Sequence, residues 1–167
     1  THDIVAKTEG EQEALKWMKS KFPPEQRNSL LLTYCYGSSK GRLAWTLVPD
    51  PKVRDDSSTW VWLLRVQAWM RDGKKNDEWK KRLETYYSQP PETHGDRMGS
   101  YLMGKIDADA LWKSTDDPKE RLEICYIFGF EAQMKGDVGT ATGYYRLVME
   151  NGTSRMGEVH WAFNRLY

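Results

Sequence analysis

The hydrophobic positions of this chain recur mostly at helical intervals of three and four residues. Proline and glycine interrupt the apolar segments at a regular rhythm, which divides the chain into stretches of helical length. These breakers are Pro23-Pro24, Pro49, Pro51, Gly73, Pro90-Pro91, Gly104, Pro118, Gly136 and Gly152. No stretch sustains a strict alternation of apolar and polar residues, and no Asn-Gly hairpin separates two β-branched runs. The pattern predicts an all-α protein with a single domain over 1–167.

Capping residues and apolar periodicity indicate where the individual helices begin and end. Thr8 and Glu11 have the spacing of a capping box that opens a first helix, and Pro23-Pro24 suits the first turn of a second. Ser57 or Ser58 is the expected cap of a helix that ends at Gly73. The remaining helices are expected over 42–48, 77–87, 97–103, 108–113, 118–135, 138–151 and 154–166.

The helix that includes Trp60 and Met70 is apolar around nearly its whole circumference. A helix of this kind lies inside the protein, because no face of it gains from contact with water. We therefore expect it at the centre of the N-terminal packing, with Trp62, Leu64 and Val66 buried.

The segment 118–153 resembles a tetratricopeptide repeat, a helix pair of about 34 residues with small residues where the helices cross. Gly129 takes the crossing position of the first helix. The other matching positions are Phe128, Gly136-Asp137, Ala141, Tyr145 and Val148, and the departures are Cys125, Ala132 and Thr153. The resemblance implies a short right-handed array of antiparallel helix pairs, with 154–167 as a closing helix.

Fainter copies of the same repeat precede it. Trp62, Trp69 and Gly73 have the same spacing as Cys125, Ala132 and Gly136 in the clear repeat. In this fainter copy Val66 takes the crossing position and Glu78 takes the position of the small residue in the second helix. Tyr101, Gly104 and Ala110-Leu111 form a further eroded copy. The number of true repeats in 1–115 is left open.

From Trp60 to Leu166 the chain resembles the C-terminal part of the NlpI-type bacterial lipoproteins. The shared features are a Trp-rich helix, a Lys-rich helix, the stretch Tyr101–Asp107, the repeat around Gly136-Asp137 and a closing helix with His160. The resemblance implies an envelope adaptor, tethered to the outer membrane, that brings peptidoglycan hydrolases and proteases together. It favours the bacterial periplasm or envelope over the cytoplasm. The lipidated cysteine of such proteins is not in this sequence, and the start at Thr1 predicts a processed or truncated N-terminus.

The charge balance argues against one class of partner. Lys and Arg number 25 against 24 Asp and Glu, a net charge of +1, whereas nucleic-acid binders present a basic stripe to the phosphates. Mean hydropathy is −0.78, but eight Trp and nine Tyr residues carry large apolar area. No run of about 18 apolar residues occurs, so we expect no membrane span.

Residues that carry catalytic or metal chemistry are sparse. The histidines His2, His94 and His160 have no second ligand three or four residues away, so we expect no metal site and no cofactor. Cys35 with His94 is a nucleophile–base pairing that any chain with one Cys and one His offers. Cys35 and Cys125 both lie in apolar runs, and we expect two buried free thiols.

Two segments invite comparison with phosphate sites. The stretch 37–41 has the composition of a phosphate loop but lacks the preceding strand and the Gly-Lys-Ser/Thr spacing. The basic cluster 80–82 has two interpretations, a phosphate contact or a solvated helix face, and we favour the solvated face.

These features favour a non-enzymatic interaction scaffold for a protein or peptide partner, with a homodimer left open. A helical enzyme domain or a nucleic-acid-binding helical-repeat protein is the alternative. The first helix of each pair lines the inner curve of a repeat array. The partner-binding candidates on that face are Tyr126, Phe130 and Gln133, and by the same register Trp60, Gln67 and Met70. Covering of Tyr126 and Phe130 by the preceding helices is the competing explanation.

Overall fold

The computed structural model describes residues 54–153 without interruption and, outside them, residues 16, 17, 20, 21, 45, 50, 51, 159, 162 and 163. All regular elements of the described residues are α-helical, which confirms the all-α class. The helices of the continuous stretch are α5 (Asp56–Arg71), α6 (Asp77–Tyr86), α7 (His94–Leu102), α8 (Ala108–Lys113), α9 (Pro118–Met134) and α10 (Val138–Asn151). The helices expected within 8–48 and the closing helix over 154–167 lie outside the described residues, apart from the isolated positions.

Each of these helices begins at a residue whose side chain accepts a hydrogen bond from the first turn, as helix N-caps do. The caps are Asp55, Asn76, Thr93, Asp107, Asp117 and Asp137. The expected cap at Ser57 or Ser58 is wrong, because Asp55 accepts from the Ser58 amide at 2.8 Å and Ser58 Oγ accepts from the Asp55 amide at 2.8 Å. Ser58 is the third helical residue of a capping box.

A second capping box explains why α7 begins earlier than the expected residue 97. Thr93 Oγ1 accepts from the Asp96 amide at 3.1 Å, and Asp96 Oδ2 accepts from the Thr93 amide at 3.4 Å. The two residues therefore satisfy amides that would otherwise be exposed at the helix start, and α7 begins at His94.

The expected ends of α5 and α9 are confirmed at Gly73 and Gly136. The Gly73 amide donates to Met70 O and the Lys74 amide donates to Trp69 O, each at 3.0 Å, which is the hydrogen-bond pattern of a Schellman motif. Gly73 and Gly136 have φ angles of +69° and +81°, which glycine adopts without the steric cost that a Cβ adds.

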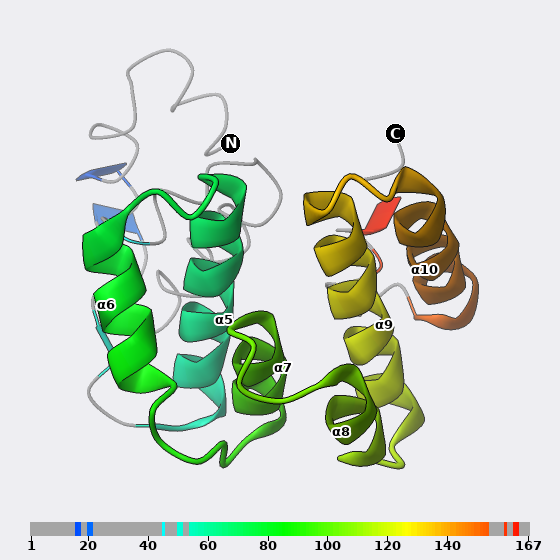
Figure 1. Cartoon of the computed structure of the whole chain (residues 1–167), viewed down its shortest axis with the longest axis horizontal. Coiled ribbons are helices and arrows are strands. Elements are labelled where there is room, and N and C mark those ends of the chain that lie inside the picture. Colours follow the sequence, from blue (N-terminus) through cyan, green and yellow to red (C-terminus); the bar gives the residue numbers. More distant parts are fainter. Residues whose placement is uncertain are drawn as a thin grey trace.

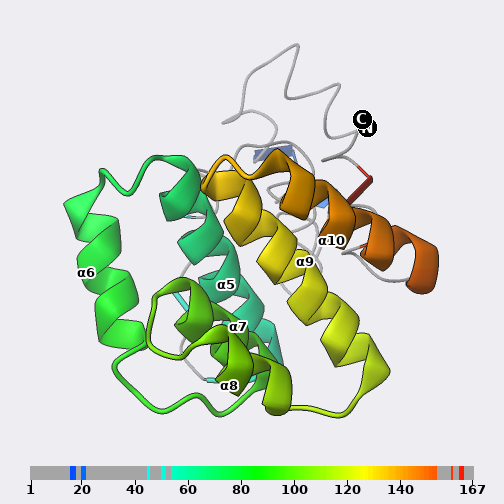
Figure 2. The same cartoon turned by 45° about the vertical axis from the view of Figure 1, so that its right-hand side comes forward.

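Four of the helices run along roughly one direction, in the spatial order α6, α5, α9 and α10 (Figure 1). The short helices α7 and α8 lie at one end of this group. In the turned view α7 and α8 lie in front of the lower halves of α5 and α9 (Figure 2). The most extensive helix packing is between α9 and α10 and between α5 and α7, and α7 also contacts α8 and α9. The short helix α7 therefore connects the two halves of the described structure.

The helix α5 lies at the centre of the packing, as its apolar circumference predicts. Trp62, Leu64 and Val66 are only 7%, 4% and 0% exposed. They belong to one hydrophobic cluster that also includes buried residues of α6, α7, α8, α9 and α10. A single continuous core of this kind makes 54–153 one packed unit.

Glycines on α9 and α7 allow neighbouring elements to approach closely at three points. A Cβ built on Gly129 of α9 would lie 2.9 Å from Cε1 of Tyr145 and 3.1 Å from Cβ of Tyr144 on α10. This close approach confirms the predicted crossing at Gly129. On α7, a Cβ on Gly95 would lie 2.7 Å from Oγ1 of Thr59 on α5, and a Cβ on Gly99 would overlap the Tyr87 hydroxyl.

The pairing expected for the first faint repeat differs from the packing observed. Val66 is fully buried, as a crossing residue would be, but Glu78 at the expected small position is exposed. The small residue that comes close to α5 is Gly95 of α7. Glycine permits the shorter distance because it has no side chain, and this pairing joins residues 36 positions apart that no local periodicity links.

Candidate interaction surface

The six partner-binding candidates divide into a buried and a partly exposed group. Tyr126 and Phe130 on α9 and Gln67 on α5 are 1%, 0% and 1% exposed. Trp60 and Met70 on α5 and Gln133 on α9 are partly exposed. Core packing accounts for the positions of Tyr126 and Phe130, since a side chain without exposed surface cannot touch a partner while the helices stay together. Direct contact with a partner is therefore available to Trp60, Met70 and Gln133, and their role stays a prediction.

One side chain of α5 reaches α9 in the structure. The guanidinium carbon of Arg71, the residue after Met70, lies 5.2 Å from the centre of the Phe130 ring. This distance is within the range of a cation–π contact. Sequence reasoning treated Arg71 only as the end of a helix, and no local signal in the sequence shows that it faces α9.

Arg71 has an unusual environment for a charged residue. Its Nε and Nη2 atoms are buried and have no hydrogen-bond acceptor. Burying guanidinium nitrogens without a partner costs free energy, because their hydrogen bonds to water are lost and not replaced.

A buried tyrosine holds the neighbouring polar group. The Tyr145 hydroxyl donates to Gln133 Oε1 at 3.0 Å, and only 1% of Tyr145 is exposed. Burial raises the pKa of Tyr145, while the positive charge of Arg71 acts in the opposite direction. The phenol therefore keeps its proton at neutral pH, so it fixes the orientation of the Gln133 amide.

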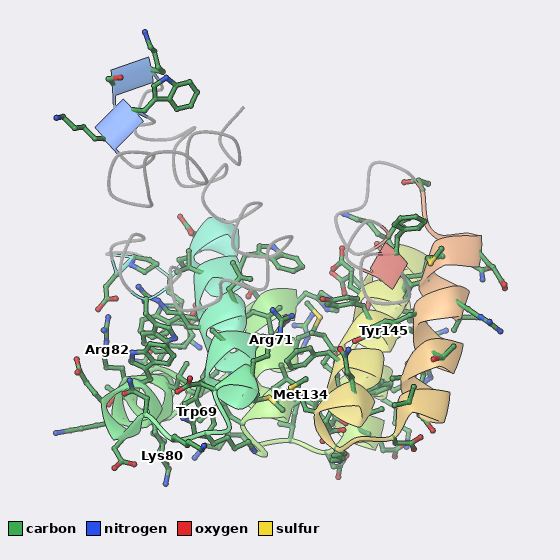
Figure 3. All side chains as sticks on the ribbon, turned by 90° about the horizontal axis from the view of Figure 1, so that it is seen from above. Trp69, Arg71, Lys80, Arg82, Met134 and Tyr145 are labelled. Atoms are coloured by element: carbon green, nitrogen blue, oxygen red, sulfur yellow. The ribbon has the colours of Figure 1, made fainter. Side chains whose placement is uncertain are left out.

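The basic cluster 80–82 does not form a phosphate site. Arg82 donates to Asp50, which also accepts from the buried Arg65 at 2.7 Å. Lys80 pairs with Glu84 at 3.8 Å. Figure 3 places Lys80 and Arg82 on different sides of α6. Because two of the three cations already have carboxylate partners and point in different directions, the solvated-face interpretation fits the structure better.

Arg65 helps to explain how so polar a sequence builds a core. Its fully buried guanidinium lies 5.0 Å from the Trp45 ring and 4.7 Å from the Trp62 ring. Trp45 stacks on Trp79 with centroids 4.8 Å apart, and Trp62 stacks on Tyr86 at 4.5 Å. The tryptophans thus serve as packing surfaces for arginine as well as for apolar side chains.

His94 is the described member of the Cys35–His94 pairing that the sequence offered. His94 is bracketed by two carboxylates, with Nδ1 3.3 Å from Glu120 and Nε2 3.3 Å from Glu123 on α9. Cys35, the other member of that pairing, lies outside the described residues. Cys125 is a buried free thiol, as expected, and burial raises its pKa, so little of it is the reactive thiolate.

Within the described part of the chain, no group of three or more His, Cys, Asp or Glu side chains is arranged to hold a metal ion. The same residues include no helix with the length and apolar character needed to cross a bilayer. Comparisons with family models, with curated proteins and with solved structures returned no match for this chain.

Proposed function

We propose that this chain is a non-enzymatic interaction scaffold of the tetratricopeptide-repeat type, which binds a protein or peptide partner on the α5–α9 side of the helix array. The observation that carries the proposal is the contact between Arg71 of α5 and Phe130 of α9. It links α5, which carries the candidates Trp60 and Met70, to the face of α9 that carries Gln133. Helix-pair arrays use such combined faces to bind extended peptides and partner helices.

Two further features support this assignment. The pair α9–α10 has a glycine at its close crossing, as the repeat pattern requires. Trp60 and Met70 keep part of their apolar surface exposed while they pack against the core. Large apolar side chains at the edge of a core are frequent anchors in protein interfaces.

The resemblance of residues 60–166 to the NlpI-type lipoproteins extends the proposal to the class of partner. Those proteins are adaptors of the bacterial envelope, so the partners we propose are envelope hydrolases and proteases. Recovery of the protein with cytoplasmic markers after fractionation of source cells would contradict the envelope assignment and leave the scaffold assignment in place.

The scaffold assignment is tested in two steps. A partner is first captured by crosslinking to the tagged full chain, identified by mass spectrometry and then purified. Its affinity is then measured against the parent chain and against Trp60→Ala, Met70→Ala and Gln133→Ala. We expect weaker binding by these variants and parent-like binding by Leu147→Ala, which removes an exposed apolar side chain from α10. Equal affinity of all four variants and the parent would refute the α5–α9 surface.

A further inference from the structure

The dipeptide Asn151-Gly152 lies where the chain leaves α10. Asn151 is the last residue of this helix and is exposed, and Gly152 has extended backbone angles, with φ −81° and ψ 160°. An asparagine that precedes a glycine is chemically reactive in water, because no side chain on the glycine shields its backbone nitrogen from the asparagine amide. No other asparagine in the sequence precedes a glycine.

Two hydrogen bonds hold the reacting groups of this dipeptide. The Gly152 amide donates to Val148 O at 2.8 Å, and Asn151 Nδ2 donates to Leu147 O at 2.9 Å. Both bonds belong to the final turn of α10, and the final turns of helices fray. When this turn opens, the Gly152 nitrogen and the Asn151 side chain are released together. Opening of a single turn therefore makes the reaction possible while the rest of the helix stays formed.

We propose that Asn151 is a site of spontaneous deamidation, which proceeds from the opened final turn of α10. The Gly152 nitrogen attacks Cγ of Asn151, so that a new N–C bond forms and the Cγ–Nδ2 bond breaks. The side-chain nitrogen leaves as ammonia and takes up the proton of the Gly152 N–H. Water then opens the succinimide ring at one of its two carbonyl carbons, which leaves aspartate or isoaspartate at position 151. The inference does not depend on the proposed scaffold function.

The product places a negative charge at an unfavourable position. The last carbonyl groups of a helix carry partial negative charge, and the exposed Glu150 already adds a carboxylate there. A carboxylate cannot donate to Leu147 O, so two acceptors would face each other where the Asn151 amide now donates. Val148 in the same turn is fully buried in the core. Deamidation therefore weakens the turn that holds Val148 against the rest of the protein.

The test follows the full chain in buffer at pH 8 and 37 °C by tryptic peptide mass spectrometry. Trypsin releases residues 147–155 as one peptide, and chromatography separates its aspartate and isoaspartate forms. Asn76 is the internal control, because its side chain accepts a hydrogen bond from the Trp79 amide at 3.0 Å and the next residue, Asp77, has a Cβ that shields the backbone nitrogen. We expect Asn151 to convert at least about fivefold faster than Asn76.

Three variants test the reacting nitrogen and the effect of the product. Gly152→Ala adds a Cβ beside the attacking nitrogen at backbone angles that alanine adopts freely, and we expect conversion at Asn151 to slow by at least about fivefold. Asn151→Asp reproduces one product and should unfold at a lower urea concentration than the parent. Asn151→Gln keeps a neutral amide and should unfold closer to the parent. A circular dichroism spectrum verifies that each variant is folded.

Several results would overturn the inference. One is an Asn151 that stays unmodified in the folded chain while the separately synthesised peptide 147–155 converts under the same conditions, because the final turn would then protect it fully. Equal conversion rates at Asn151 and Asn76, or an unchanged rate in Gly152→Ala, would remove the proposed site as well. An Asn151→Asp variant with the urea midpoint of the parent would refute the predicted weakening of α10.

Discussion

The crossing of α9 and α10 at Gly129 leads to a quantitative prediction. In Gly129→Ala the new Cβ would lie 2.9 Å from Cε1 of Tyr145, whereas carbon atoms in contact prefer about 3.5–4.0 Å. Tyr145 cannot easily move away, because it is buried and its hydroxyl is bonded to Gln133. Overpacking of this kind costs about 1–3 kcal/mol.

The higher helix propensity of alanine opposes this cost. A substitution at a second glycine measures the gain from helix propensity alone. Alanine is favoured over glycine inside a helix by about 1 kcal/mol. Gly143 of α10 has no neighbouring atom within 4 Å of a built Cβ, so Gly143→Ala should raise the free energy of unfolding by about 1 kcal/mol. Gly129→Ala should change it by between about 0 and −2 kcal/mol, which places the two variants about 1–3 kcal/mol apart. Gly129→Leu should lower it further, by a few kcal/mol.

Urea unfolding followed by far-ultraviolet circular dichroism measures these differences. The slope of the free energy against urea concentration should be the same in the parent and the variants, so that the midpoints report stability alone. The reasoning fails if Gly129→Ala stabilises the protein as much as Gly143→Ala does. An unchanged thermal melt for Gly129→Leu would remove the close crossing and, with it, the repeat assignment of 118–153.

Three further predictions concern local packing and titration. Gly99→Ala should destabilise the protein more than Gly129→Ala, because its Cβ would overlap the buried Tyr87 hydroxyl. Adding Tyr87→Phe to the same chain should recover part of the lost stability in urea unfolding, and no recovery would contradict this contact. The hydrogen bond from the Thr140 amide lowers the pKa of Asp137, so Asp137 stabilises α10 when ionised, and this stabilisation is lost as pH falls through its folded pKa. In unfolding measured from about pH 5 to pH 2, Asp137→Asn should therefore lose less stability than the parent, and parallel curves would disprove it. Burial raises the pKa of the Cys125 thiol, so iodoacetamide at pH 8 should modify Cys125 at least about tenfold more slowly in the native chain than in the urea-unfolded chain. Peptide mass spectrometry measures the two rates, and equal rates would show that the thiol is accessible.

The boundaries of most described helices follow from the sequence alone, because their signals are local. Pro118 marks the first turn of α9, and Gly136 ends it with a positive φ angle. The segment 108–113 matches α8 to the residue. Caps, prolines and left-handed glycines act within one turn, so their effect does not depend on the rest of the fold.

The packing partner of each helix face depends on residues far apart in the chain, and only the tertiary structure decides it. Periodicity places Tyr126 and Phe130 on one face of α9, yet it cannot distinguish an open groove from a face that other helices cover. The close approach of Gly95 to Thr59 joins α7 to α5. Likewise, the position of Arg71 over Phe130 depends on the placement of α5 and α9, both of which pack against α7. Local rules specify which residues share a helix face, whereas the burial of that face is a property of the whole assembled core.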